Sequence, residues 1–340
     1  MKKKAILIGF GGMGQRYYKA LNKINVKVVG ICDLKAKKIK KVVNDKNVVV
    51  TKNYKKLLEL KADLVCIVSN TESRFKIISD FLEKSKIKKI LTEKPLATSY
   101  KKCLKILKLV NKTKKYVLVN TYRTISPNYL KVKNFFKKNR EKITHITINS
   151  PCAGLGNMGS VFFDLTNFFF EKRVKSLRGW IDKTKTKNPR GAKFKDPGGY
   201  GIINYEDDKK AFFDMSENTG LPYKIILKSK NYEFVIDEIN NNYYYEKRPT
   251  RLDKKPNYYY IFKPERKKMK LAHKYDTVLM TTYSLKKILK NSKIINNLNL
   301  KEAVNVMEII FGLHISSKLN DEIKLPILKK FHDFSINFAW

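Results

Sequence analysis

The chain has 340 residues, of which 43% are hydrophobic and 12% aromatic, so it can bury a substantial core and is not of the disordered class. Its length fits two domains of ordinary size, and no apolar run approaches the roughly 18 residues of a transmembrane helix. The net charge of +43 would suit a nucleic-acid partner, but the lysines are spread along the whole chain, which favours compositional bias over a dedicated nucleic-acid site. An anionic substrate would still be attracted by such a charge.

The first 120 residues alternate short apolar runs with amphipathic stretches. The apolar runs predict strands at Ala5–Gly9, Lys27–Cys32, Val48–Val50, Asp63–Ser69, Lys88–Thr92 and Tyr116–Asn120. Between them we expect helices at Met13–Ile24, Ala36–Asn44, Tyr54–Leu60, Ser73–Lys84 and Tyr100–Thr113. Continuous apolar runs are typical of buried parallel strands, and strands that alternate with helices form βαβ units. Residues 1–122 are therefore predicted to form a doubly wound parallel sheet of the Rossmann type.

After Arg123 the pattern changes, and residues 123–340 are predicted to form an α+β domain rich in antiparallel strands. Helices are expected at Asn128–Asn139, Ser160–Phe170, Tyr275–Leu289 and Leu300–Ser317. A strand is expected at His145–Asn149, and hairpins from Gly201–Asn204 with Lys210–Met215 and from Lys224–Lys228 with Tyr232–Asp237. The polar, Tyr-rich segment Asn240–Lys267 predicts no regular element.

The basic start followed by an apolar run resembles a signal peptide, but the run breaks at once into glycines. We interpret it as the first strand and expect a cytoplasmic protein. The cysteines form no C-x-x-C pair and no zinc-ligand spacing with histidine, so neither a disulfide nor a metal site is expected. They are Cys32, Cys66, Cys103 and Cys152.

A glycine-rich loop follows the first strand. Residues 9–14 read G-F-G-G-M-G, which matches G-x-G-x-x-G between a strand and a helix. Glycines allow the tight turn, the approach of a pyrophosphate and close helix packing, and the helix N-terminus offers free N–H groups to phosphates. The predicted cofactor contacts are Gly9, Gly11, Gly12, Met13 and Gly14. A plain glycine-rich turn is the competing interpretation.

The second strand ends in Asp33, about 20 residues beyond the loop, where a carboxylate binds the adenosine ribose hydroxyls. Asp33 favours NAD because a carboxylate repels a 2′-phosphate. Lys35 and Lys37 could weaken that preference, so NADP remains an alternative.

Four further segments of the sequence carry a resemblance to a known family, two of them with less specific motifs. Val68–Arg74 follows the fourth strand, and Thr92–Ala97 contains a Glu-Lys-Pro element after the fifth. Together with Tyr122–Pro127 and Asn299–Ser317, they make the chain resemble the glucose–fructose oxidoreductase, inositol dehydrogenase and MocA-like (Gfo/Idh/MocA) family over most of its length.

The resemblance implies a Rossmann domain followed by a domain with an open, largely antiparallel sheet. It implies hydride transfer between a nicotinamide and a sugar, cyclitol or nucleotide sugar, in surface-polysaccharide or nucleotide-sugar metabolism, by a homodimer or homotetramer. It implies cofactor contacts at Ser69, Asn70, Glu93 and Lys94, and a substrate contact at Arg123. Lys94 would lie beside the nicotinamide and donate a hydrogen bond or proton to the substrate oxygen, before a Pro95 that often follows a cis bond.

The sequence departs from the family at the second-domain helix, which usually carries an Asp and a catalytic His. Asp164 is present, but the His position falls on Asn167 or Phe168, neither of which can exchange a proton near neutral pH. The histidines lie elsewhere, at positions His145, His273, His314 and His332.

Three explanations remain open. Lys94 can carry the acid/base work, with Asp164 orienting it and Asn167 binding the sugar. A tyrosine, Tyr122 or Tyr200, can replace the histidine. Or the chain binds the dinucleotide without catalysing, as a sensor or partner protein.

Overall fold

Six apolar runs near the start of the chain form one parallel sheet in a computed structural model that describes residues 2–43, 45–151, 154–183, 191, 193–252, 262–290 and 300–338. The strands are β1 (Lys4–Ile8), β2 (Lys27–Cys32), β3 (Val49–Thr51), β4 (Leu64–Ile67), β5 (Lys89–Thr92) and β6 (Tyr116–Val119). Their order is β3-β2-β1-β4-β5-β6, with every neighbour parallel. This is the strand order of a dinucleotide-binding doubly wound sheet, so the predicted Rossmann fold is confirmed.

The helices of this half lie close to their predicted positions. They are α1 (Gly12–Lys23), α2 (Ala36–Val42), α3 (Thr71–Lys84) and α4 (Tyr100–Thr113). Asn70 and Ser99 cap α3 and α4 by accepting hydrogen bonds from backbone N–H groups of the first turn. The helix expected over residues 54–60 is only a short 3-10 turn, η1 (Tyr54–Leu57). The predicted end of α2 at Asn44 lies outside the described residues.

The second half of the chain forms a nine-stranded sheet. Its strands are β7 (His145–Asn149), β8 (Val174–Ile181), β9 (Gly199–Tyr205), β10 (Lys210–Asp214), β11 (Lys224–Lys228), β12 (Tyr232–Asp237), β13 (Asn242–Lys247), β14 (Glu265–Lys268) and β15 (Ile323–Lys324). In the order β14-β13-β12-β11-β7-β10-β9-β8-β15, the described pairs are antiparallel except β7 with β10. The predicted α+β second domain is confirmed.

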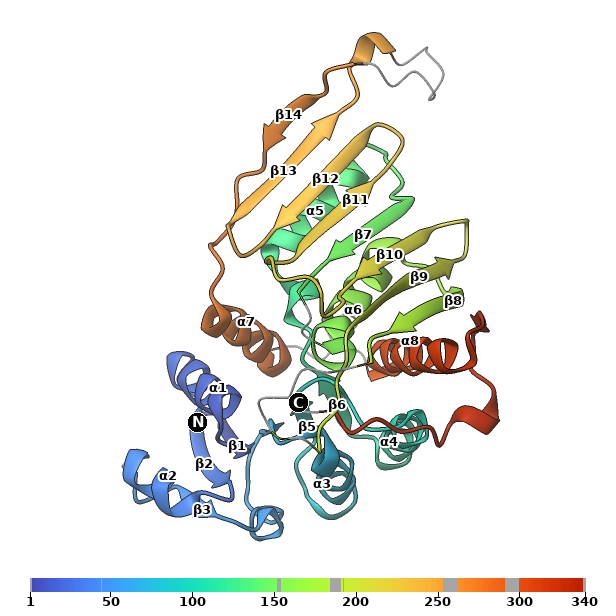
Figure 1. Ribbon diagram of the computed structural model, residues 1–340. Helices are drawn as coiled ribbons and strands as arrows, with labels where there is room; N and C mark the ends of the chain where they lie inside the picture. The colour runs from blue at the N-terminus through green and yellow to red at the C-terminus, as the bar shows by residue number, and fades with distance from the viewer. Residues whose placement is uncertain are drawn as a thin grey trace.

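Helices cover one face of this sheet and also return to the first one. Figure 1 shows α5 (Pro127–Lys138) and α6 (Ser160–Phe170) behind the second sheet. Late in the chain, α7 (Thr277–Lys290) packs against α1, and α8 (Leu300–Leu319) packs against β8, α4 and α6. One hydrophobic cluster therefore runs from Ile67 of the first sheet through Ile106 and Phe311 to Ile225 of the second. A domain boundary between residues 122 and 123 remains a prediction.

Short helical turns complete the described fold. They are η2 (Tyr122–Ile125), the π-helical turn η3 (Gly154–Gly159), η4 (Thr250–Leu252) and η6 (Lys329–Phe331). No helix in the described ranges is long and apolar enough to cross a membrane.

Some strands have no counterpart among the predicted elements. In β8, the buried residues Leu177 and Gly179 alternate with charged or exposed residues. These are Lys175, Arg178 and Trp180. Its sequence therefore contains no continuous apolar run that would predict a strand. β13 and all but the last residue of β14 fall within the segment Asn240–Lys267, for which no element was predicted, and all four residues of β14 are exposed.

Candidate active site

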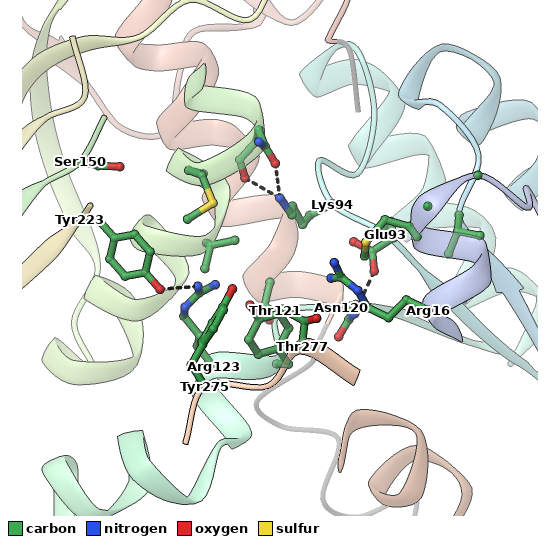
Figure 2. A pocket seen from close by; sticks show the side chains of 18 of the residues that line it. Arg16, Glu93, Lys94, Asn120, Thr121, Arg123, Ser150, Tyr223, Tyr275 and Thr277 are labelled. Atoms are coloured by element: carbon green, nitrogen blue, oxygen red, sulfur yellow. Dashed lines mark hydrogen bonds between the residues drawn. The ribbon is translucent and has the colours of Figure 1, made fainter. Parts of the chain in front are cut away.

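A cavity of about 650 Å³ lies beyond the carboxyl ends of the parallel strands and faces the second domain (Figure 2). Its volume is within the roughly 300–1,000 Å³ of ligand sites, and crevices at this edge of an open α/β sheet are where ligands bind. The lining residues are Gly11, Gly12, Met13, Arg16, Val68, Ser69, Arg74, Glu93, Lys94, Asn120, Thr121, Tyr122, Arg123, Ser150, Pro151, Asn157, Met158, Val161, Tyr223, Tyr275 and Thr277.

The glycine loop forms one wall of this cavity. Gly9 has φ +98°, and a Cβ on it would lie 2.8 Å from the Val68 carbonyl oxygen. A Cβ on Gly14 would lie 2.3 Å from the Gly9 oxygen. A Cβ on Gly11 or Gly12 would meet no atom within 4 Å. Two glycines therefore allow the tight turn, and two leave open the space that a phosphate group needs.

Asp33 lies directly beside the loop. Its Oδ2 accepts a hydrogen bond from the Phe10 N–H at 2.8 Å, and its Oδ1 accepts one from the Lys35 N–H at 2.8 Å. The carboxylate thus fixes the loop from the end of β2. Asp33 does not line the 650 Å³ cavity.

Ser69 and Asn70, at the end of β4, differ in position. Ser69 lines the cavity. Asn70 is exposed and does not line it; its Oδ1 accepts a hydrogen bond from the Ser73 N–H at 3.2 Å as the cap of α3. Arg74 of α3 is buried and donates to the main-chain oxygens of Ser69, at 2.6 Å, and of Pro95. Arg74 therefore ties the end of β4 to the Lys94–Pro95 bond, which is cis.

Glu93 belongs to a buried network under the cavity. Tyr17 Oη donates to Glu93 Oε1 at 2.7 Å, and Asn120 Nδ2 donates to the same oxygen at 2.8 Å and to Tyr17 Oη at 2.7 Å. Asn120 Oδ1 is buried and has no hydrogen-bond partner among the described residues. This network fixes Glu93 between α1, β5 and β6.

Lys94 follows Glu93 and reaches towards the second domain. Its Nζ donates to the main-chain oxygen of Asn157 at 2.8 Å and also to Asn157 Oδ1, as the dashed lines in Figure 2 show. Burial lowers the pKa of Lys94 to about 8, against the opposing effect of the Glu93 carboxylate. A lysine with this pKa can donate or accept a proton near neutral pH.

Arg123 lines the cavity on the opposite side from Glu93 (Figure 2) and forms a buried ion pair. Its Nε and Nη2 donate to Glu238 Oε2 at 3.0 and 2.8 Å, and Nη2 also donates to Tyr223 Oη at 2.8 Å. Tyr223 Oη in turn donates to Glu238 Oε2. The charge of Arg123 is therefore largely balanced by the protein.

Asp164 is buried behind the cavity wall and does not line the cavity. Burial raises the pKa of its carboxyl to about 8, although hydrogen bonds with Thr121 and Thr124 lower it. Thr121 does line the cavity. Asp164 is therefore separated from the cavity by the Thr121 side chain. With a pKa of about 8, its carboxyl is largely protonated at neutral pH.

Asn167 and Tyr200 lie away from the cavity. Asn167 is about 9 Å further along α6 than the lining residue Val161, and its Oδ1 accepts a hydrogen bond from Tyr205 Oη at 2.8 Å. Tyr200 is 49% exposed and stacks on Trp180 with ring centroids 5.3 Å apart, on the second sheet. Tyr122 does line the cavity, and burial raises the pKa of its phenol.

None of the four histidines lines the cavity. His314 is deep in α8, where burial lowers its pKa to about 4. Of the cysteines, Cys32, Cys66 and Cys103 are buried and unbridged, and Cys152 lies outside the described residues. Among the described residues, no group of three or more His, Cys, Asp or Glu side chains is arranged so that it could hold a metal ion.

Several lining residues were not predicted from the sequence. Arg16, Asn120, Ser150, Asn157, Tyr223, Tyr275 and Thr277 converge from different elements. Of these, Asn120 had a usable signal, because it ends an apolar strand in the same way as Asp33 and Glu93.

Comparison with known proteins agrees with this geometry. The family described as "Oxidoreductase family, NAD-binding Rossmann fold" (GFO_IDH_MocA) matches residues 3–121. None of the curated proteins searched matches the sequence.

Solved structures share the fold over nearly the whole chain. An NAD binding oxidoreductase from Klebsiella pneumoniae has a TM-score of 0.78 at 11% identity, covering 96% of this chain and 99% of that one. UDP-N-acetylglucosamine 3-dehydrogenase GnnA from Acidithiobacillus ferrooxidans has a TM-score of 0.74 at 12% identity, covering 94% and 99%. A super-repressor mutant of Gal80p from Saccharomyces cerevisiae has a TM-score of 0.76 at 11% identity, covering 99% and 100%. At these identities the likeness shows the fold alone.

Proposed function

We propose that this chain, whose residues 3–121 match the Gfo/Idh/MocA family of NAD-binding oxidoreductases, is an NAD(P)-dependent dehydrogenase or reductase of a carbohydrate derivative. The observation that carries the proposal is Lys94, whose pKa is lowered to about 8 inside a cavity that begins at the glycine loop.

The residues present fit a dinucleotide. Gly11 and Gly12 leave space that any side chain would fill, and they stand at the N-terminus of α1, where backbone N–H groups favour phosphate. Asp33, at the end of β2, is the residue that would accept hydrogen bonds from the adenosine ribose. It supports NAD over NADP, with Lys35 and Lys37 as the reason to test both.

The chemistry would take place between Lys94 and the second-domain wall. The bound nicotinamide would supply or accept a hydride at the carbon of a C–OH or C=O group. In the reducing direction, the Lys94 ammonium would donate its proton to the carbonyl oxygen as the C–H bond forms, and the neutral amine would then regain a proton from water. In the oxidising direction, the neutral amine would remove the hydroxyl proton.

The substrate is proposed to be a sugar, cyclitol or nucleotide sugar, and an anionic one is favoured by the charge. Arg16, Arg74 and Lys94 line the cavity against one lining carboxylate, Glu93, whereas the charge of Arg123 is balanced by Glu238. The fold likeness to a UDP-N-acetylglucosamine dehydrogenase supports a nucleotide sugar, and a role in surface-polysaccharide metabolism follows as a proposal. A cytoplasmic location and a homodimer or homotetramer also remain proposals.

The second candidate is a dinucleotide-binding regulatory or partner protein without catalysis. It is motivated by the absent histidine at Asn167–Phe168 and by the fold likeness to a Gal80p variant, which is described as a super-repressor mutant and not as an oxidoreductase.

Calorimetric titration with NADH and NADPH, followed by a screen of keto-sugars and nucleotide sugars at saturating reduced cofactor, tests the proposal. We expect tighter binding of NADH and turnover of at least one substrate. Tight NADH binding with no turnover across the panel would favour the regulatory candidate, and no binding of either cofactor would refute both.

A further inference from the structure

The ammonium group of Lys94 has three N–H donors, and two of them go to a single residue. They bind the main-chain oxygen and Oδ1 of Asn157. No other acceptor of this ammonium is found among the described residues, and Lys94 lines the cavity, so the third donor can serve a ligand there. Lys94 comes from the first domain and Asn157 from η3 in the second, so this contact joins the two walls of the cavity.

Asn157 is in turn held by Asp196, in the segment before β9. Asp196 Oδ1 accepts a hydrogen bond from the Gly156 N–H at 2.7 Å, and Oδ2 accepts one from the Asn157 N–H at 2.9 Å. Gly154 has φ +78°, and a Cβ there would lie 2.3 Å from Asp196 Oδ2, so the carboxylate fits closely under the turn. Ser160 Oγ adds a hydrogen bond to the Asn157 main-chain oxygen at 2.8 Å.

We propose that Asp196 and Asn157 form a positioning clamp that holds the Lys94 ammonium with one N–H directed to the substrate oxygen. This inference rests on the proposed function of the cavity. In the clamp, Asn157 binds Lys94 directly, and Asp196, which does not line the cavity, acts through the η3 turn. The clamp takes the orienting role that sequence analysis gave to Asp164, and it needs no histidine.

The clamp also affects the protonation of Lys94 electrostatically. The charged groups that act on the Lys94 ammonium are Glu93 and Asp196, which favour it, and Arg123 and Arg74, which disfavour it. Asp196 therefore supports the protonated form that a proton donor needs, in a site where burial favours the neutral amine.

The test is the pH dependence of Lys94 acylation in the full-length protein. Trace labelling with acetic anhydride, quantified on the Lys94 peptide by mass spectrometry, gives the pKa of this amine without any substrate. Asp196→Asn removes a negative charge, and Asn157→Ala removes one acceptor of the ammonium. We expect each substitution to lower the pKa of Lys94 by about one unit. Asn157→Asp keeps the acceptor and adds a charge, so it should raise this pKa.

Asp214→Asn is the matched control, because Asp214 also accepts a backbone N–H bond, from Ser216 at 3.0 Å, at the end of β10. It should leave the pKa of Lys94 unchanged. Circular dichroism and NADH affinity establish that each variant is folded. If both Asp196→Asn and Asn157→Ala leave the pKa of Lys94 unchanged or raise it in folded protein, the clamp is refuted. That result is distinct from failure of the proposed function, which would appear as absent NADH binding in the wild-type protein.

Discussion

Two groups at the site have pKa values moved towards 8 from opposite directions. Burial lowers the pKa of the Lys94 ammonium and raises that of the Asp164 carboxyl, each to about 8. In both cases the leading cause is the loss of water around the charged form. The two side chains therefore change protonation in the same pH range, one in the cavity and the other directly behind its wall.

For Lys94, we expect carbonyl reduction to fall as the pH rises through about 8, because only the ammonium can donate a proton. The oxidising direction should rise over the same range. Lys94→Ala should lower the rate about 10²–10⁴-fold, with NADH affinity little changed. Initial rates from pH 6 to 10 in both directions check this, and wild-type turnover in Lys94→Ala would contradict a proton-transfer role.

For Asp164, the raised pKa has a consequence for stability. Below about pH 4 the carboxyl is protonated in both folded and unfolded chains. Between about 4 and 8 only the unfolded chain loses the proton, so the stabilising contribution is lost progressively as the pH rises, by up to about 1.4 kcal/mol per unit. Asp164→Asn has no such group and should become more stable relative to the wild type from pH 5 to pH 8. Urea denaturation at each pH measures this difference, and parallel curves would contradict it.

At the scale of elements, the glycine loop shows two different uses of the same residue type. Gly9 and Gly14 stand where any Cβ would collide with backbone, whereas Gly11 borders the cavity with free space around it. The first pair determines the fold of the β1–α1 turn, and Gly11 determines what can enter the cavity.

We therefore expect Gly11→Val to lose cofactor affinity while the protein stays folded, because the branched side chain occupies the proposed pyrophosphate position. Gly14→Ala should destabilise the protein, since its Cβ would lie 2.3 Å from the Gly9 oxygen. Gly220→Val is the control, because a Cβ there also meets no atom within 4 Å but lies outside the cavity. Calorimetry and thermal melting separate the effects, and unchanged NADH affinity in Gly11→Val would place the cofactor elsewhere.

The sequence predicted the first sheet well because local patterns determine it. Buried parallel strands such as β4 and β5 are continuous apolar runs, and the residues that follow them lie at one edge by topology. Glu93 and Lys94, which follow β5, line the cavity, and so does Arg123. The cofactor and substrate contacts that the family resemblance implies for them stay predictions.

The second-domain contribution could not be predicted in the same way. Asn157 is in a π-helical turn whose geometry depends on Asp196, about 40 residues later, and Tyr223 reaches the cavity through its bond with Arg123. Such contacts depend on tertiary packing and leave no periodic pattern. Asn167 was predicted from the position of the family's histidine on this helix, whereas α6 contributes only its N-terminal end to the cavity.

Across the whole molecule, one hydrophobic cluster joins the two sheets. The hydrophobic cluster extends through α4 and α8 into both sheets, and α7 packs on α1. Arg123, just after the first sheet, forms its buried pair with Glu238, just after β12, with only 3% of each side chain exposed. The cavity therefore lies at a junction between the two sheets that contributes to stability.

This arrangement predicts that Glu238→Ala destabilises the whole chain. The substitution leaves the Arg123 guanidinium buried without its carboxylate, which typically costs about 3–5 kcal/mol. Glu246→Ala removes a carboxylate from a pair with Arg266, whose side chain is 64% exposed, and should cost far less stability because solvent screens the pair. Urea denaturation measures both effects.

Hydrogen exchange tests whether the two sheets unfold together. If the continuous core couples the sheets, Glu238→Ala should lower protection of backbone amides in β1 and β5 as much as in β7 and β10. Loss of protection confined to β12 and its neighbours would show that the two sheets unfold independently.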